Sequence, residues 1–178
     1  MATTNLIDVT FSSVGDEVVD LTYVKLYAAI STSTHDTLLT SLIKAARVEI
    51  EKLASISIVT KTVRVEWDYV NESVVLPYPK INSITSLVSG EDTLTLDTDY
   101  TVKGSSKKTI YGTFVNGLVA TYTAGYGSST PEDLKLAIAK HALENFEQRT
   151  GIVTNSSNVL PNNWRVTALN YRPTWLMF

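Results

Sequence analysis

The hydrophobic period of the chain changes after Ala54, and this change constrains the fold class more than any other feature. Between Asp36 and Ala54 apolar residues recur every three or four positions, which is typical of one face of an α-helix. From Ser57 to Asp68 the period becomes two, with Val63 and Val65 alternating with polar neighbours, which indicates a strand with one apolar face. The sequence therefore predicts an α+β protein.

Two antiparallel helices are predicted at the N-terminal side, over residues 17–29 and 35–55. Asp16 stands at the start of the first helix, and Ser33 or Thr34 can cap the second. The serine and threonine run before His35 is expected to form the turn between them. The charged residues of the second helix are expected on its wet face: Lys44, Arg47, Glu49, Glu51 and Lys52.

A third helix is predicted over residues 131–150, because Pro131 suits a first helical position and Thr130 can cap it. Gly151 is expected to end this helix. The helix carries a second apolar stripe beside its first one, so it should be covered on more than one side. We expect this stripe to form a contact between subunits through Leu136, Ala139, Leu143 and Phe146.

Between these helices, residues 57–123 are predicted to form an inserted small antiparallel β-sheet. Strands this short and rich in threonine and serine bury one face at most, so we expect them to pack on the helices rather than form a separate sandwich. After the first strand, further strands are expected at Ser73–Leu76, Ser83–Ser89, Tyr100–Val102, Thr109–Tyr111 and Gly117–Thr123.

The last segment, residues 152–178, is predicted to be an extended C-terminal arm beyond a single domain over residues 1–151. It contains two arginines, no lysine or acidic residue, and two prolines that rule out a long helix. Arginine and large aromatic residues dominate binding hot spots, so the arm is expected to pack against a partner or to fold back over its own sheet. The candidate contact residues are Trp164, Arg165, Tyr171, Arg172, Trp175 and Phe178.

The sequence predicts no catalytic residue, no cofactor site and no metal site. It has no cysteine and only two histidines, His35 and His141, and neither has an evident partner for acid–base chemistry. The glycines of Gly125-Tyr126-Gly127 resemble part of a dinucleotide fingerprint, but Thr130 stands where a third glycine is needed. These glycines are better explained by a sharp turn from strand into helix.

Charge and hydropathy exclude several classes of function. Fifteen basic and eighteen acidic residues give a net charge of −3, so no global attraction to nucleic acid or anionic membrane is expected. Lys103, Lys107 and Lys108 form a small basic tip that is typical of a soluble loop. The N-terminal residues lack the features of a signal peptide and no segment is long and apolar enough to span a membrane, which predicts a cytoplasmic protein without membrane partners.

The order of these parts resembles a known family. The stretches LLTSLIKAARVEIEKLASISIVTKTVRVEWD, VVLPYPKINSITSLV, DTDYTV and GLVATYTAGYGSSTPEDLKLAIAKHALENFEQRTG are similar to the head-tail connector, or adaptor, proteins of long-tailed phages and prophages. The resemblance covers roughly residues 17–151. Its most specific parts are Ala45-Ala46-Arg47, the hairpin from Leu76 to Ile84, and the junction from Ala124 to Lys135.

This resemblance implies a structural, non-enzymatic virion protein that assembles in the host cytoplasm and takes its place in the neck. Such a protein is expected to form a twelve-fold ring beneath the portal protein and to line a channel through which double-stranded DNA passes without sequence specificity. It would also seat a downstream neck, stopper or tail-completion protein. The C-terminal segment of connectors commonly reaches the portal, which gives the aromatic arm a role.

A small β-rich module that binds carbohydrate or another surface is the alternative. Aromatic side chains on strands can stack on sugars, although they more often belong to a core or to cross-strand pairs. The candidates for stacking are Trp67, Tyr69, Tyr78, Tyr111, Tyr122 and Tyr126.

Overall fold

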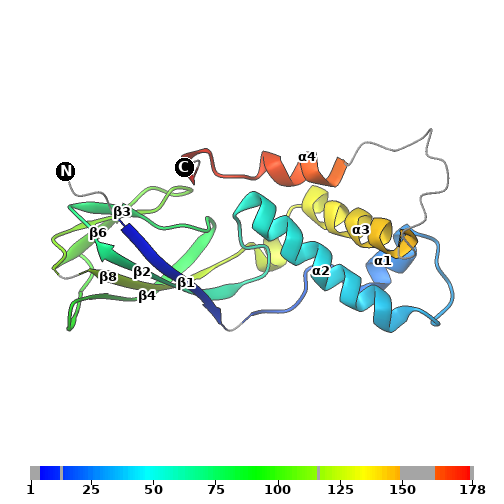
Figure 1. Cartoon of the computed structure of the whole chain (residues 1–178), viewed down its shortest axis with the longest axis horizontal. Helices are drawn as coiled ribbons and strands as arrows, with labels where there is room; N and C mark the ends of the chain where they lie inside the picture. The colour runs from blue at the N-terminus through cyan, green and yellow to red at the C-terminus, as the bar shows by residue number, and fades with distance from the viewer. Residues whose placement is uncertain (1–4, 13, 116, 149–162, 177–178) are drawn as a thin grey trace. The chain divides into compact units, whose positions relative to one another are not determined.

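The computed structural model describes residues 5–12, 14–115, 117–148 and 163–176 (Figure 1). It confirms the α+β class, with four α-helices and two antiparallel sheets in this part of the chain. The chain divides into two compact units. Met1–Asp16 with Val59–Tyr126 form the β unit, and Glu17–Ile58 with Gly127–Phe178 form the helical unit. No described helix is long and apolar enough to cross a membrane.

The β unit consists of a five-stranded sheet and a three-stranded sheet. The larger sheet has the order β1-β2-β8-β4-β5 and the smaller one the order β3-β7-β6, and all pairings between these strands are antiparallel. The strands are β1 (Asn5–Ser12), β2 (Lys61–Tyr69), β3 (Ser73–Val75), β4 (Ile81–Ser89), β5 (Asp92–Thr93), β6 (Tyr100–Lys103), β7 (Thr109–Gly112) and β8 (Leu118–Ala124). Strands β1 and β5 were not predicted from the sequence.

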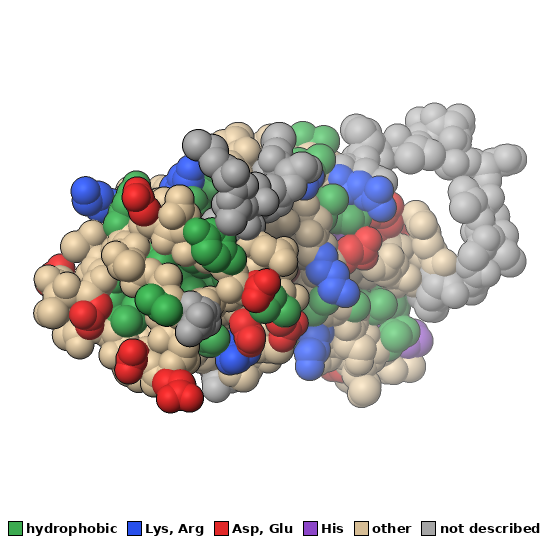
Figure 2. Space-filling model, turned by 60° about the vertical axis from the view of Figure 1, so that its left-hand side comes forward, with side chains coloured by type: hydrophobic (Ala, Val, Ile, Leu, Met, Phe, Trp, Pro, Cys, Tyr) green, Lys and Arg blue, Asp and Glu red, His purple; other side chains and the backbone are tan. Residues whose placement is uncertain are grey.

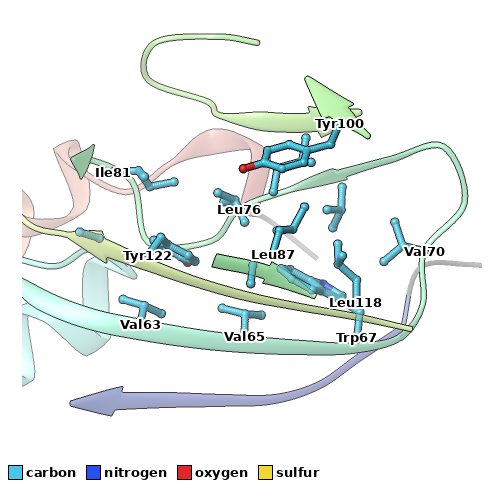
Figure 3. Close-up of a cluster of buried hydrophobic side chains, with 14 residues drawn as sticks. Val63, Val65, Trp67, Val70, Leu76, Ile81, Leu87, Tyr100, Leu118 and Tyr122 are labelled. Atoms are coloured by element: carbon cyan, nitrogen blue, oxygen red, sulfur yellow. The ribbon is translucent and has the colours of Figure 1, made fainter. Parts of the chain in front are cut away.

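The two sheets share one hydrophobic core (Figure 3). The period-two pattern of β2 places Val63, Val65 and Trp67 in this core, where the cluster also includes Tyr100 of β6 and Ile110 of β7. The expectation that the short strands pack on the helices is therefore wrong. The strands of the smaller sheet supply their own apolar residues, and these complete a core with the larger sheet.

Tyr122 of β8 is fully buried in this core, and its hydroxyl donates a 2.6 Å hydrogen bond to the carbonyl oxygen of Pro77. Burial raises the pKa of the Tyr122 hydroxyl, and the neighbouring Tyr78 adds to the rise. At the end of β8, Gly125 has a φ of +135°, and a Cβ there would lie 2.3 Å from the carbonyl oxygen of Val59. Only glycine fits this turn, as the sequence predicted.

The helical unit contains α1 (Leu21–Tyr27), α2 (Asp36–Ala54), the 3-10 turn η1 (Gly127–Ser129), α3 (Glu132–Glu147), α4 (Asn163–Asn170) and the 3-10 turn η2 (Thr174–Leu176). Helix α1 is shorter than predicted because the side chain of Asp20, rather than Asp16, caps it through the Tyr23 amide. Helix α2 begins after His35 without a side-chain cap from Ser33 or Thr34. The Thr130 hydroxyl binds the carbonyl oxygen of Gly127 instead of capping α3. Gly151 lies outside the described residues.

Helix α4 falls where an extended arm was expected. The prolines at 161 and 173 limit the length of a helix but leave room for one between them. Trp164 and Ala168 are buried, and α4 packs on α2 and α3. This segment therefore folds back onto the helices of its own unit.

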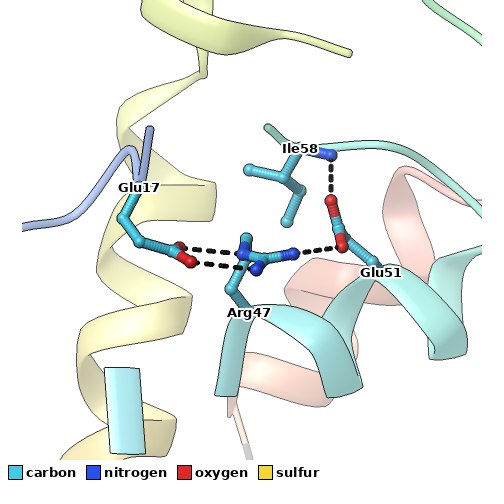
Figure 4. Close-up of polar contacts among 4 residues, drawn as sticks. All are labelled: Glu17, Arg47, Glu51 and Ile58. Atoms are coloured by element: carbon cyan, nitrogen blue, oxygen red, sulfur yellow. Dashed lines mark hydrogen bonds and ion pairs between the residues drawn. The ribbon is translucent and has the colours of Figure 1, made fainter. Parts of the chain in front are cut away.

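A buried ion-pair network joins the N-terminal segment of the helical unit to α2 (Figure 4). Arg47 donates to both carboxylate oxygens of Glu17, at 2.8 and 2.9 Å, and to Glu51 at 2.6 Å. The other oxygen of Glu51 accepts a 2.7 Å bond from the Ile58 amide. Arg47 and Glu51 were expected on the wet face of this helix but are buried, because these partners satisfy their charges.

We predict that Arg47→Met lowers the free energy of unfolding by about 3–5 kcal/mol, because it leaves the Glu51 carboxylate buried without its cation. Urea unfolding followed by far-ultraviolet circular dichroism measures this loss. Lys44→Met on the exposed side of the same helix is the matched control, with an expected change within about 0.5 kcal/mol. Equal stability of the two variants would show that the network contributes nothing.

The raised pKa of Tyr122 predicts alkaline destabilisation. Above the ordinary tyrosine pKa the unfolded chain loses the phenolic proton while the folded chain keeps it, so stability is full below that pKa and falls as pH rises above it. Tyr122→Phe removes this contribution, and its midpoint for urea unfolding should therefore fall less between pH 9 and pH 11, about the range of tyrosine ionisation. An identical alkaline loss in both proteins would contradict the assignment to Tyr122.

Candidate assembly surfaces

The described residues contain no group of three or more histidine, aspartate or glutamate side chains that could hold a metal ion. The acidic loop after β5 is occupied by local contacts, since a carboxylate oxygen of Asp99 accepts a 2.7 Å bond from the Thr95 amide.

His141 of α3 has partners that the sequence did not reveal. Its Nε2 lies 2.7 Å from a carboxylate oxygen of Glu49 on α2, and its ring stacks on Trp164 of α4 with centroids 3.8 Å apart. The indole N–H of Trp164 donates a 2.8 Å bond to Glu144 of α3. Glu49 is 92 positions from His141 in the chain, so no local pattern could have identified the pair. The cluster joins α2, α3 and α4 through their side chains.

This cluster fixes which side of α4 faces inward. Trp164 is only 4% exposed, whereas Val166 and Leu169 are 57% and 45% exposed. Arg165 and Arg172 are exposed as well. Helix α4 and the turn after it, which contains Arg172, thus present an outer face of apolar and basic side chains that no described residue covers; this surface is called the outer face of α4.

The other candidate residues of the arm lie in different settings. The Tyr171 hydroxyl donates a 2.7 Å bond to Asp133 at the start of α3, and Trp175 is half-buried. Phe178 lies outside the described residues. Among the six candidates, Arg165 and Arg172 are therefore the described ones that are exposed.

The apolar stripe of α3 is mostly turned toward the helical unit itself. Ala139 is completely buried, and Leu136, Leu143 and Phe146 are half-buried. The ring of Phe146 meets the ring of His35 edge to face, with centroids 5.4 Å apart. Helices α1, α2 and α4 all pack on α3, which explains why the helix is apolar on more than one side.

The aromatic residues considered for carbohydrate stacking are divided between core and surface. Trp67 and Tyr122 are buried in the core of the β unit. Tyr69 and Tyr111 are exposed, and the Lys103 ammonium lies 5.2 Å from the ring centroid of Tyr111. Two of the six candidates are thus unavailable to a sugar.

Figure 2 shows green apolar and red acidic side chains reaching the surface of the β unit in that view.

Solved structures resemble this chain over almost its whole length. A chain in the neck of an empty gene transfer agent (GTA) particle, computed with C6 symmetry, is 17% identical, with a TM-score of 0.71 over 92% of this chain and 95% of that chain. A chain in the virion of a native GTA particle is 16% identical, with a TM-score of 0.72 over 93% and 95%. A chain in the native GTA neck computed with C12 symmetry is 16% identical, with a TM-score of 0.63 over 96% and 95%. These likenesses show a shared fold.

No curated protein matches the sequence. The family model described as "Head completion protein" matches residues 17–155. This range agrees with the resemblance to head-tail connectors over residues 17–151, which is thereby confirmed. The chain belongs to the head completion protein family, whose members are structural proteins of the virion and not enzymes.

Proposed function

We propose that this protein forms a ring of twelve subunits beneath the portal, joins the DNA-filled head to the neck, and seats a downstream neck, stopper or tail-completion protein. The observation that carries this proposal is the match to head completion proteins together with a fold shared with chains of GTA necks and of a GTA virion over 92% or more of the sequence. One of those necks was computed with C12 symmetry, which supports the proposed number of subunits.

The proposed ring surrounds a channel for double-stranded DNA. A conduit must let the duplex slide, so many strong contacts with phosphates would hinder it. The net charge of −3 is compatible with such a channel because it provides no general attraction to DNA. Contact with the passing duplex would therefore be independent of its sequence.

The outer face of α4 is the proposed contact with the portal. Arg165 and Arg172 are its exposed cations, and Val166 and Leu169 supply the exposed apolar surface between them. Trp164 has a different role in this proposal, since its stacking on His141 holds α4 in place from the inner side. Tyr171, Trp175 and Phe178 would extend the contact toward the C-terminus.

The α3 stripe is proposed as one part of the contact between neighbouring subunits. Leu136, Leu143 and Phe146 keep part of their surface accessible and can touch a neighbour. Ala139 is completely buried, so it would support this surface from within rather than contact the neighbour.

The proposal predicts the mass of the complex with the portal. The purified protein mixed with its cognate portal ring should bind at one subunit per portal chain, because each subunit of a twelve-fold ring meets an equivalent portal site. Light scattering coupled to size-exclusion chromatography measures this stoichiometry. A protein that stays monomeric and ignores the portal would contradict the proposed function.

Charge reversal on α4 tests the portal contact. Arg165→Glu with Arg172→Glu should weaken portal binding by roughly tenfold or more. In the proposed contact these arginines face acidic groups of the portal, so the introduced glutamates would place like charges opposite one another. The matched control is Lys44→Glu with Lys52→Glu on the exposed side of α2, which should bind normally.

Trp164→Ala distinguishes the stabilising role of the inner face of α4 from the proposed portal contact of its outer face. It should lower the free energy of unfolding by about 3–5 kcal/mol, as expected for truncation of a buried tryptophan. The arginine reversals should lower it by about 1 kcal/mol or less, because Arg165 loses only its cation–π contact with the Trp164 ring, 5.0 Å from the centroid. Cosedimentation with portal rings and urea unfolding provide the two readouts. Normal portal binding by the double arginine variant would remove this face of α4 from the contact.

A further inference from the structure

Strand β1 is an exposed edge of the larger sheet. It pairs with β2 on one side, and no strand of the described part of the chain pairs with its other side. Leu6, Ile7 and Phe11 are 48%, 56% and 42% exposed, which is unusual for apolar residues of a strand. An edge of this kind offers unpaired backbone N–H and C=O groups together with apolar side chains, and both favour the addition of another strand.

The geometry of β1 suits such pairing. Its register with β2 is irregular only between Asn5 and Asp8, so the stretch from Asp8 to Ser12 is a regular strand. The β1 sequence NLIDVTFS contains no proline or lysine, the residues that commonly block an edge against pairing. Nothing in this regular stretch opposes a further strand except the charge of Asp8.

The charge of Asp8 indicates which kind of strand can pair with β1. Asp8 is exposed and lies opposite Glu66 of β2, and a like-charged pair across two strands is unfavourable. Glu66 already has Arg64 as its cation, at 2.9 Å. A basic residue on an added strand would offset the charge of Asp8 as well.

One free edge of the β unit carries basic residues. The edges at β5 and β3 are acidic, with Asp92 in β5 and Glu72 just before β3. Strand β6 ends instead in Lys103 and is followed by the basic tip with Lys107 and Lys108. Leu96 bridges Tyr100 at the start of β6, so the stretch available for pairing runs from Thr101 to Lys103.

Asp8 of β1 and Lys103 of β6 both lie on the face of their sheet that points away from the core. The register places Asp8 and Thr10 on the face of the larger sheet that points away from the core, beside Glu66 and Arg64. Lys103 likewise lies on the outer face of the smaller sheet, above Tyr111. Pairing of β1 with β6 would therefore bring Asp8 and Lys103 together on one face.

We propose that β1 of one subunit pairs with β6 of the next, with Asp8 beside Lys103, so that neighbouring β units are joined around the ring. Both complementary edges belong to the same chain, and a contact between two different surfaces is the kind that closes a ring of identical subunits. A second copy of this chain is therefore the partner that fits. The inference rests on the proposed ring and adds the contact that would link its β units.

Cysteine cross-linking tests this pairing, because the natural chain has no cysteine. The double variant Asp8→Cys with Lys103→Cys is assembled on portal rings, oxidised, and analysed by denaturing electrophoresis without reductant. We expect a ladder of covalent multimers that ends at the ring size. Each single variant should stay a covalent monomer. Asp8→Cys with Asp92→Cys is the matched control, and it should give no ladder because the β5 edge carries no proposed contact.

Charge exchange provides a second readout. Asp8→Lys and Lys103→Glu should each raise the protein concentration needed for half-maximal assembly by roughly tenfold, because each places like charges side by side. The combined variant should recover most of the loss. Light scattering measures assembly independently of cross-linking.

The outcomes distinguish the pairing from the ring itself. Rings of normal mass without a ladder from the Asp8→Cys/Lys103→Cys protein would overturn the strand pairing and leave the proposed function intact. Covalent dimers from Asp8→Cys alone would show two β1 strands pairing with each other, which also overturns it. A protein that stays monomeric with the portal would overturn both the ring and the pairing.

Discussion

The helical unit depends on a buried arginine. Burial alone would lower the pKa of Arg47, but the hydrogen bonds and charges of Glu17 and Glu51 outweigh it, so the pKa is raised and the guanidinium stays charged. Glu17 and Ile58 are the first and last residues of one segment of this unit, and Gly127 begins the other. Glu51 accepts a hydrogen bond from the Ile58 amide, and the Gly127 amide donates one to the Ile58 carbonyl oxygen. The network therefore connects the ends of the two chain segments that form the helical unit.

The sequence predicted the regular elements because their apolar residues are periodic. Helices α2 and α3 and strands β2, β4 and β8 all lie close to their predicted positions. Strand β1 was missed because a bulge interrupts its alternation: Leu6, Val9 and Phe11 share a face only after the shift in register near Ile7. Helix α4 was not predicted because the prolines on either side rule out a long helix, and this composition was interpreted as an extended arm although a short helix fits between them.

Contacts between distant residues were beyond the reach of sequence patterns. Arg47 and Glu17 are 30 positions apart, and charged residues on a helix are normally solvated, so the buried network could not be predicted. The same limit applied to Glu49, His141 and Trp164. The composition of the arm pointed to its arginines and aromatics as a group, but only the structure separates the exposed Arg165 from the buried Trp164.

The surfaces available for assembly now divide by role. The outer face of α4 combines cations with apolar side chains and is the proposed contact with the portal, whereas the α3 stripe and the edges at β1 and β6 are the proposed contacts between subunits.

Electron cryomicroscopy of whole particles carrying this protein tests the connector role most directly. A twelve-fold ring with the described fold of this chain, placed between the portal and the next neck component, is the predicted result. A neck built without this chain, or its presence elsewhere in the particle, would contradict the connector role.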